Sequence, residues 1–192
     1  MDGLEAYLDE LASSRPTPGG GSAATIVGAL GAALVAMVAR ITHEPALVER
    51  ADDVRARLLS NRTADELAFG AVVDAQALPR GSDAEKAARA ARLQSALRTA
   101  AEVPLHSAQL AREVLTLALE AAELPNRNLV SDAGCAAEFA AAAVRAAAYN
   151  VRANHPYLKD RVLVAGQAAQ LDALESQTAE LLDRARRASA GA

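Results

Sequence analysis

Aromatic residues, cysteine and excess positive charge are all scarce in this 192-residue chain. Aromatic side chains make up 3% of it while hydrophobic residues make up 52%, so Ala, Leu and Val must fill the interior. Small side chains favour closely packed helices over a sheet sandwich. The net charge of −4 offers no basic face for a phosphate backbone, so we expect no nucleic-acid partner. The single cysteine, Cys135, excludes an internal disulfide and suits a cytoplasmic location.

Metal-ligand spacings and targeting signals are also lacking. The three histidines lie far apart, and none has a spacing such as HExxH, so we expect no metal. The N-terminus carries Asp2 and Glu5 and lacks the basic-then-apolar layout of a signal peptide. Residues 22–39 contain no charge and approach the length of a membrane span. About half of them are Ala or Gly, and no aromatic belt flanks them, so we interpret the segment as a buried central helix and expect no membrane contact.

Proline, glycine and helical periodicity divide the chain into helices. The prolines and glycines of residues 16–21 break the first junction, and Pro156 marks the last. Ser82 and Glu85 have the spacing of a capping box, and Pro104 should kink or split the helix that follows. No strand-like alternation is present. We predict an all-α, single-domain, up-and-down bundle over residues 1–192, with helices at 2–13, 21–42, 46–78, 82–122, 131–155 and 157–189.

The second predicted helix is apolar on every face. Gly28, Ala32 and Ala36 recur every four residues, a spacing that lets a partner backbone come close. A helix that is apolar all round needs neighbours all round, and six helices barely enclose one in a monomer. We therefore expect a homodimer whose interface involves these helices.

The segment Pro16-Thr17-Pro18-Gly19-Gly20-Gly21-Ser22 runs directly into that helix. Three glycines leave no side chain above the backbone, and Ser22 is placed to cap the helix. The free N–H groups of a first helical turn favour a carboxylate or phosphate. A tight turn without a ligand explains the same residues equally well.

Asp65 is the first candidate for acid–base chemistry. It shares one helix face with Leu58, Phe69 and Val72, and burial among apolar side chains raises the pKa of a carboxyl group toward neutrality. The structural alternative is a salt bridge to Arg62, three residues earlier. We expect its neighbour Glu66 to be solvated.

Three further groups of polar residues lie toward the C-terminus. Ser131 and Asp132 precede an alanine-rich helix, where such residues commonly act as caps. Asn150 and Asn154 share a face with Ala143 and Ala147, so their amides need partners, in another helix or in a ligand. We expect Cys135 in the core, and His106 partly buried or at the surface.

Five blocks of sequence resemble the formiminotetrahydrofolate cyclodeaminase and methenyltetrahydrofolate cyclohydrolase family, in the same order. They comprise residues 12–42 with PTPGGGS and ALGAAL, ADELAF at 64–69, VPL at 103–105, SDAGCAA at 131–137 and YNVRAN at 149–154. The resemblance implies an all-helical, dimeric enzyme that acts on tetrahydrofolate carrying a one-carbon unit. One departure is His43-Glu44-Pro45-Ala46, where the family often has a longer basic stretch, so we expect weaker binding of folate polyglutamate tails.

The resemblance also implies roles for individual residues. Asp65 matches the family's catalytic proton carrier, and Asp132 is placed to accept hydrogen bonds from a pterin ring. The implied substrate-binding residues are Pro18, Gly19, Gly20, Gly21, Ser22, Ser131, Asp132, Asn150 and Asn154.

Within the family we favour hydrolysis of 5,10-methenyltetrahydrofolate to 10-formyltetrahydrofolate, because the chain carries no formimidoyltransferase domain. This reaction implies no metal or redox cofactor. The alternatives are formiminotetrahydrofolate cyclodeaminase and a non-catalytic module that binds folate or dimerises.

Overall fold

The computed structural model describes residues 2–190 of the chain, and the described part is almost entirely helical. Its elements are the six α-helices α1 (Asp2–Leu11), α2 (Gly20–Ile41), α3 (Pro45–Ala77), α4 (Asp83–Ala122), α5 (Val130–Asn154) and α6 (Arg161–Ala190), with the short 3₁₀ helices η1 (Arg127–Leu129) and η2 (His155–Tyr157). The predicted all-α fold is therefore confirmed, and most helix boundaries agree within two residues.

Local signals explain where the helices begin and end. Ser82 and Glu85 form the predicted capping box at the start of α4. Pro104 does not split α4, which continues without interruption to Ala122. The last helix begins later than predicted, because Pro156 lies in η2 and the side chain of Asp160 then accepts the N–H of Leu163 at 3.0 Å.

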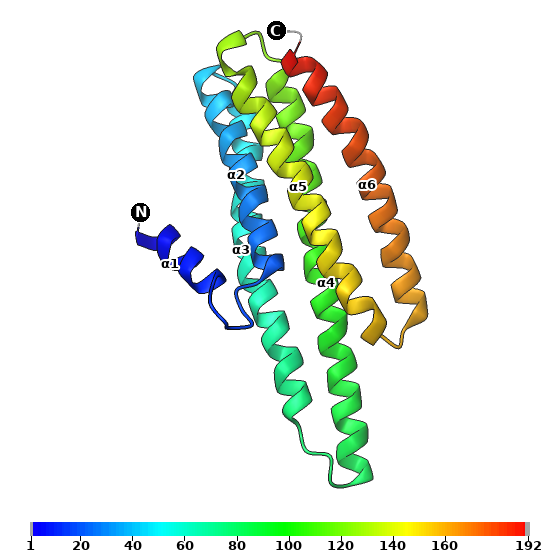
Figure 1. Ribbon diagram of the computed structural model, residues 1–192. Coiled ribbons are helices and arrows are strands. Elements are labelled where there is room, and N and C mark those ends of the chain that lie inside the picture. The colour runs from blue at the N-terminus through cyan, green and yellow to red at the C-terminus, as the bar shows by residue number, and fades with distance from the viewer. Residues whose placement is uncertain (1, 191–192) are drawn as a thin grey trace.

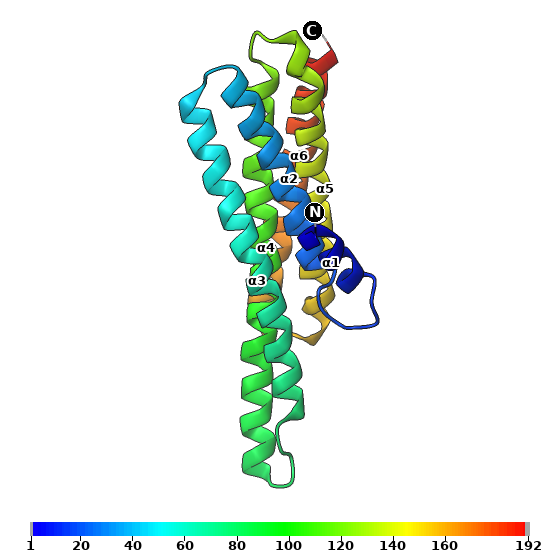
Figure 2. The same ribbon diagram turned by 90° about the vertical axis from the view of Figure 1, so that its left-hand side faces the viewer.

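Five of the helices form an up-and-down bundle, and α1 stands at its side (Figures 1 and 2). The helices α4 and α5 form its centre: α4 contacts α2, α3, α5 and α6, while α5 contacts α2, α4 and α6. The ends of α3 and α4 that meet at the turn near residue 80 project beyond the bundle as a two-helix hairpin (Figure 1).

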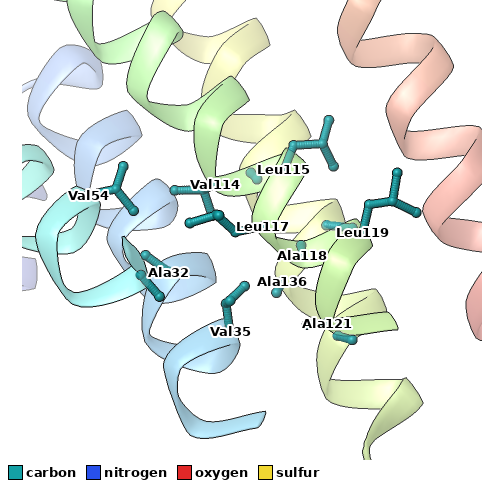
Figure 3. Close-up of a cluster of buried hydrophobic side chains, with 14 of the residues drawn as sticks. Ala32, Val35, Val54, Val114, Leu115, Leu117, Ala118, Leu119, Ala121 and Ala136 are labelled. Atoms are coloured by element: carbon teal, nitrogen blue, oxygen red, sulfur yellow. The ribbon is translucent and has the colours of Figure 1, made fainter. Parts of the chain in front are cut away.

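Alanine dominates the core, as the composition predicts. Figure 3 shows small side chains of α2 and α5, including Ala32 and Ala136, beside larger ones of α4 such as Leu115 and Leu117. A β-carbon added to Gly31 would lie 3.0 Å from the carbonyl oxygen of Ala136, so the backbones of α2 and α5 approach closely at that point. This close approach is the contact that small residues permit in a helical interface.

The helix α2 has one buried and one open side. It is long and apolar enough to cross a membrane by composition, and 61% of that apolar window is buried inside the protein. Gly28, Ala32 and Ala36 lie on the buried side, whereas Leu30 and Ile41 are each 52% exposed. The interpretation as a core helix is supported, but the expectation of burial on every side is wrong for a single chain.

Candidate active site

A cavity of about 630 Å³ opens where the start of α2, the C-terminal part of α3, the N-terminal half of α4 and the end of α5 meet. That volume lies within the range of sites that hold a drug-sized ligand. The cavity is lined by Pro16, Thr17, Gly19, Gly20, Gly21, Asp65, Ala68, Phe69, Val72, Gln76, Leu93, Gln94, Leu97, Ala100, Asn150, Asn154 and Tyr157. The structure thus brings together the glycine turn of residues 16–22, Asp65 and the two asparagines, which lie in three separate parts of the sequence.

The glycine turn makes room for the carboxylate of Asp65. A β-carbon on Gly21 would lie 2.4 Å from Asp65 Oδ1 and 2.5 Å from Oδ2, distances that real β-carbons essentially never show. The backbone N–H of Ser22, at the start of α2, acts on the same carboxylate and lowers its pKa. The start of α2 therefore lies beside an acidic group that the chain itself supplies from α3, and the binding of a ligand anion there stays a prediction.

Three effects act on the pKa of Asp65. Burial is the largest of them and raises the pKa of this carboxyl group. The Ser22 N–H lowers the pKa, and the neighbouring Glu66 carboxylate raises it. The net effect is a pKa above the ordinary value of an aspartate, which suits a group that accepts and returns a proton near neutral pH.

Behind the turn, a polar network joins α1, α2 and α3. The hydroxyl of Ser22 contacts the Tyr7 hydroxyl at 3.0 Å and donates to Glu66 Oε1 at 3.2 Å. Arg62 Nη1 bonds the same Glu66 oxygen at 3.2 Å, and its guanidinium lies 5.8 Å from the centre of the Tyr7 ring.

This network corrects three expectations. Ser22 lies inside α2 and does not cap it, since Gly19 is the N-cap residue. Glu66 is half-buried and hydrogen-bonded instead of solvated. It forms the salt bridge with Arg62, so Arg62 is not the salt-bridge partner of Asp65. Pro18 and Ser22, both predicted to bind substrate, are buried and do not line the cavity, so their contact with a ligand stays a prediction.

Both predicted asparagines line the cavity from α5. Asn154 Nδ2 donates to the carbonyl oxygen of Ala100 on α4 at 3.0 Å and to that of Asn150 at 2.9 Å. Asn150 Nδ2 donates to the Ala146 carbonyl at 2.9 Å. The helix–helix hydrogen bond that the sequence left open is therefore present for Asn154, and the face remains available to a ligand.

The rest of the lining is apolar or neutral. Phe69 and Val72 face the cavity from α3, as the shared helix face with Asp65 predicted. Gln76, Gln94 and Tyr157 were not predicted, because no local pattern shows that the hairpin and η2 lie beside the glycine turn. No Lys or Arg lines the cavity within the described chain, so the only charge that its walls offer at neutral pH is the acidic group of Asp65.

Ser131 and Asp132 lie outside this cavity, in the first turn of α5. At 1.5 Å per residue they are about 27 Å along α5 from Asn150. They also do not cap α5, whose N-cap residue is Leu129, without a side-chain bond. Within one chain the expected contact with a pterin is therefore not supported. Two other residues also lie away from the site: His106 is exposed, as expected, and Cys135 is exposed, so its placement in the core is wrong.

Comparison with known proteins finds relatives that are similar in sequence over most of this chain. Residues 3–173 match the sequence model of the family described as formiminotransferase-cyclodeaminase. A methenyltetrahydrofolate cyclohydrolase of Methylorubrum extorquens is 44% identical, and the alignment covers 94% of this chain and 92% of that protein. The formimidoyltransferase-cyclodeaminase of Mus musculus is 33% identical over 83% of this chain, which matches 31% of the mouse protein.

A solved structure has the same fold over nearly the whole length. The formiminotetrahydrofolate cyclodeaminase of Thermotoga maritima superposes with a TM-score of 0.87 and 29% sequence identity, covering 98% of this chain and 96% of that one. Together with the family match over residues 3–173, this shows that the chain belongs to the formiminotransferase-cyclodeaminase family.

Proposed function

We propose that this protein hydrolyses 5,10-methenyltetrahydrofolate to 10-formyltetrahydrofolate, with Asp65 as the group that carries the proton. The family makes the chain an enzyme of folate one-carbon metabolism of the cyclohydrolase or cyclodeaminase type. The cyclohydrolase is favoured by the 44% identity to a protein of that name, which this chain matches over nearly its full length.

The observation that carries the mechanism is the position of Asp65. Its carboxylate lines the cavity beside the start of α2 and is the only acidic side chain of the lining among residues 2–190. The methenyl carbon is part of a cation, so an acidic wall without Lys or Arg attracts the substrate and stabilises its charge.

The reaction requires one mobile proton. Water adds to the methenyl carbon, and Asp65 as carboxylate accepts a proton from it, which leaves a neutral tetrahedral centre and a protonated Asp65. The bond from this carbon to the pterin nitrogen N5 then breaks while Asp65 protonates the nitrogen. The remaining hydroxyl becomes the formyl oxygen and releases its proton to solvent, so Asp65 returns to its starting state.

The test is the loss of the near-ultraviolet absorbance of methenyltetrahydrofolate with protein, compared with buffer. We expect a rate well above the spontaneous one, and Asp65→Asn should reduce the enhancement by about 10²- to 10⁴-fold. Asp74→Asn removes an exposed carboxylate from the same helix and should keep full activity. A wild-type rate equal to that in buffer would refute the proposed activity, and full activity in Asp65→Asn would refute the role of the aspartate.

Cyclodeaminase activity is the second candidate, because the solved structure with the same fold has that name. In that reaction Asp65 as acid would protonate the departing ammonia. Ammonia release from 5-formiminotetrahydrofolate, measured on the same protein sample, separates the two activities. Folate binding by calorimetry without either activity would identify a non-catalytic binding module.

The open side of the bundle supports a homodimer. The helices α2 and α5 both pack on α4, so their exposed residues face away from it. Large apolar side chains of both helices are exposed: Leu30 and Ile41 on α2, and Phe139 and Tyr149 on α5. Exposed apolar surface of this kind is typical of a protein–protein interface. We therefore propose that the protein is a homodimer. We also propose that it is cytoplasmic and uses no metal or redox cofactor.

A further inference from the structure

Pro104 leaves one carbonyl of α4 without its helical partner. In an α-helix the N–H of residue 104 would donate to the carbonyl oxygen of residue 100, and proline has no N–H. Ala100 lines the cavity, and its carbonyl instead accepts a hydrogen bond from Asn154 Nδ2 of α5 at 3.0 Å. An asparagine on a different helix therefore replaces the missing donor.

These contacts fix which way the amide of Asn154 faces. A carbonyl only accepts, so the –NH₂ of Asn154 must lie toward its two carbonyl partners, Ala100 and Asn150. Both of its N–H groups are then used. Its Oδ1 forms no hydrogen bond within residues 2–190, and it is the polar atom that this side chain can offer to a ligand.

The neighbouring Asn150 is oriented in a similar way. Its Nδ2 donates to the Ala146 carbonyl at 2.9 Å, and its Oδ1 lies 3.6 Å from the position of a β-carbon on Gly20. Asn150 therefore offers an oxygen and one remaining N–H beside the glycine turn. Side chains one helical turn apart stand about 5–6 Å from each other.

We propose that Asn154 is a specificity-determining residue that accepts a hydrogen bond from the exocyclic amino group of the pterin ring, and that Pro104 is the positioning residue that orients it. The choice of a folate as ligand rests on the function proposed above. The carboxylates of folate have no donor for an acceptor-only group, whereas an amino group has two N–H donors. An amino group with two N–H donors can bond one oxygen from each of two side chains that stand one helical turn apart.

This places the pterin ring against α5, beside the glycine turn and Asp65. The remaining apolar wall of Phe69, Val72, Leu93 and Leu97 then receives the aromatic linker of the ligand. The amides of α5 take the role that the sequence suggested for Asp132.

The first experiment tests whether the preference for a ligand with the pterin amino group depends on the side chain of Asn154. Tetrahydrofolate and an analogue with hydrogen in place of the pterin amino group are titrated by calorimetry into wild type and Asn154→Leu. We expect wild type to bind tetrahydrofolate about tenfold to a hundredfold more tightly than the analogue. In Asn154→Leu the ratio should fall several-fold, because one of the two acceptors of the amino group is gone while Asn150 Oδ1 remains. An unchanged ratio in the variant, or the lack of a preference in wild type, would overturn the proposal.

The second experiment separates ligand recognition from helix packing. Asn154→Leu leaves the Ala100 carbonyl without a donor, and adding Pro104→Ala supplies a backbone N–H in the same helix. We expect the double variant to regain the melting temperature that Asn154→Leu loses, yet to keep the reduced preference of Asn154→Leu for tetrahydrofolate. Recovery of the preference together with the melting temperature would show that Asn154 acts only through packing, which contradicts the proposal.

These measurements do not depend on turnover. A protein that prefers tetrahydrofolate in the way described but leaves methenyltetrahydrofolate intact would refute the proposed activity and keep this inference. A protein that hydrolyses methenyltetrahydrofolate but binds both ligands equally would refute only this inference.

Discussion

The carboxylate of Asp65 occupies the space that a β-carbon on Gly21 would need, with Oδ1 only 2.4 Å from that position. The glycine on α2 and the acid on α3 are separated by more than forty residues, and each determines what the other position can hold. The glycine turn therefore admits the chain's own acid into the cavity, in addition to shaping the space for a ligand.

Gly21→Ala should remove most of the activity. The new methyl group displaces the Asp65 carboxylate from the Ser22 N–H and from its place in the cavity, and small displacements of a catalytic group cost about 10²-fold in rate. The measurement is kcat/KM for methenyltetrahydrofolate. Gly166→Ala is the matched control, because a β-carbon there meets nothing within 4 Å. Wild-type kinetics in Gly21→Ala would show that this close contact does not matter for catalysis.

Asp65→Asn should stabilise the protein at neutral pH by about 1 kcal/mol while activity is lost. The folded state raises the pKa of Asp65, so it holds the proton more tightly than the unfolded chain does. The stabilisation that protonation provides is complete at low pH and is lost as the pH rises through the folded pKa. The extra stability of Asp65→Asn relative to wild type should thus appear at pH 7 and vanish in acid.

Thermal melts at several pH values test this stabilisation, with Asp74→Asn as the control. That residue is an exposed carboxylate on the same helix. A lower melting temperature for Asp65→Asn than for wild type at pH 7 would contradict the expected cost of burying the charge.

The rate of hydrolysis should fall on the acid side of a raised pKa. The proposed base is the carboxylate, and burial raises the pKa at which Asp65 loses its proton. After subtraction of the spontaneous rate, kcat/KM should therefore decrease as the pH is lowered, with a midpoint above the ordinary aspartate value of about 3.9. A profile that stays flat to below that value would argue against Asp65 as the base.

Asp132→Asn should leave kcat and KM within about twofold of wild type. Asp132 lies in the first turn of α5, about 27 Å along that helix from Asn150, so it does not reach a ligand in the cavity of the same chain. Steady-state kinetics of the variant check this directly. A tenfold rise in KM at unchanged stability would place the Asp132 of a second copy near the cavity.

Leu30→Asp should dissociate the proposed homodimer. The charge would lie at the middle of the open side of α2, where burial in an interface costs free energy unless it is paired. Light scattering at micromolar concentration should give a dimeric mass for wild type and a monomeric mass for the variant. Val162→Asp, on the exposed side of α6, is the control and should stay dimeric. A monomeric wild type would refute the dimer itself.

Local signals in the sequence predicted much of the helical framework. The capping box at Ser82 and the prolines at junctions act within a few residues, so their effect can be predicted without the fold. Pro104 does not split α4, and the carbonyl of Ala100 that it leaves free is bonded by Asn154, fifty residues later in the sequence. The helix therefore remains continuous where its own sequence favours a break.

The site could be predicted only in part, for a similar reason. Helical spacing placed Asp65 with Phe69 and Val72, and these three residues do line the cavity. The spacing of residues along one helix does not reveal which end of a neighbouring helix lies opposite. That is why Ser131 and Asp132, which match a family pattern, turned out to lie at the other end of the bundle.

Because the hairpin of α3 and α4 projects from the bundle, the two ends of the cavity differ in how many helices pack around them. The glycine turn and Asp65 lie where α2 packs on α3 and α5, whereas Gln76 lies one residue before the end of α3, close to the tip of the hairpin. Segments with fewer packed neighbours open at lower free energy. Amide hydrogens near the hairpin tip should therefore exchange with solvent first, and a bound ligand that bridges both ends would slow their exchange more than that of the α2 amides.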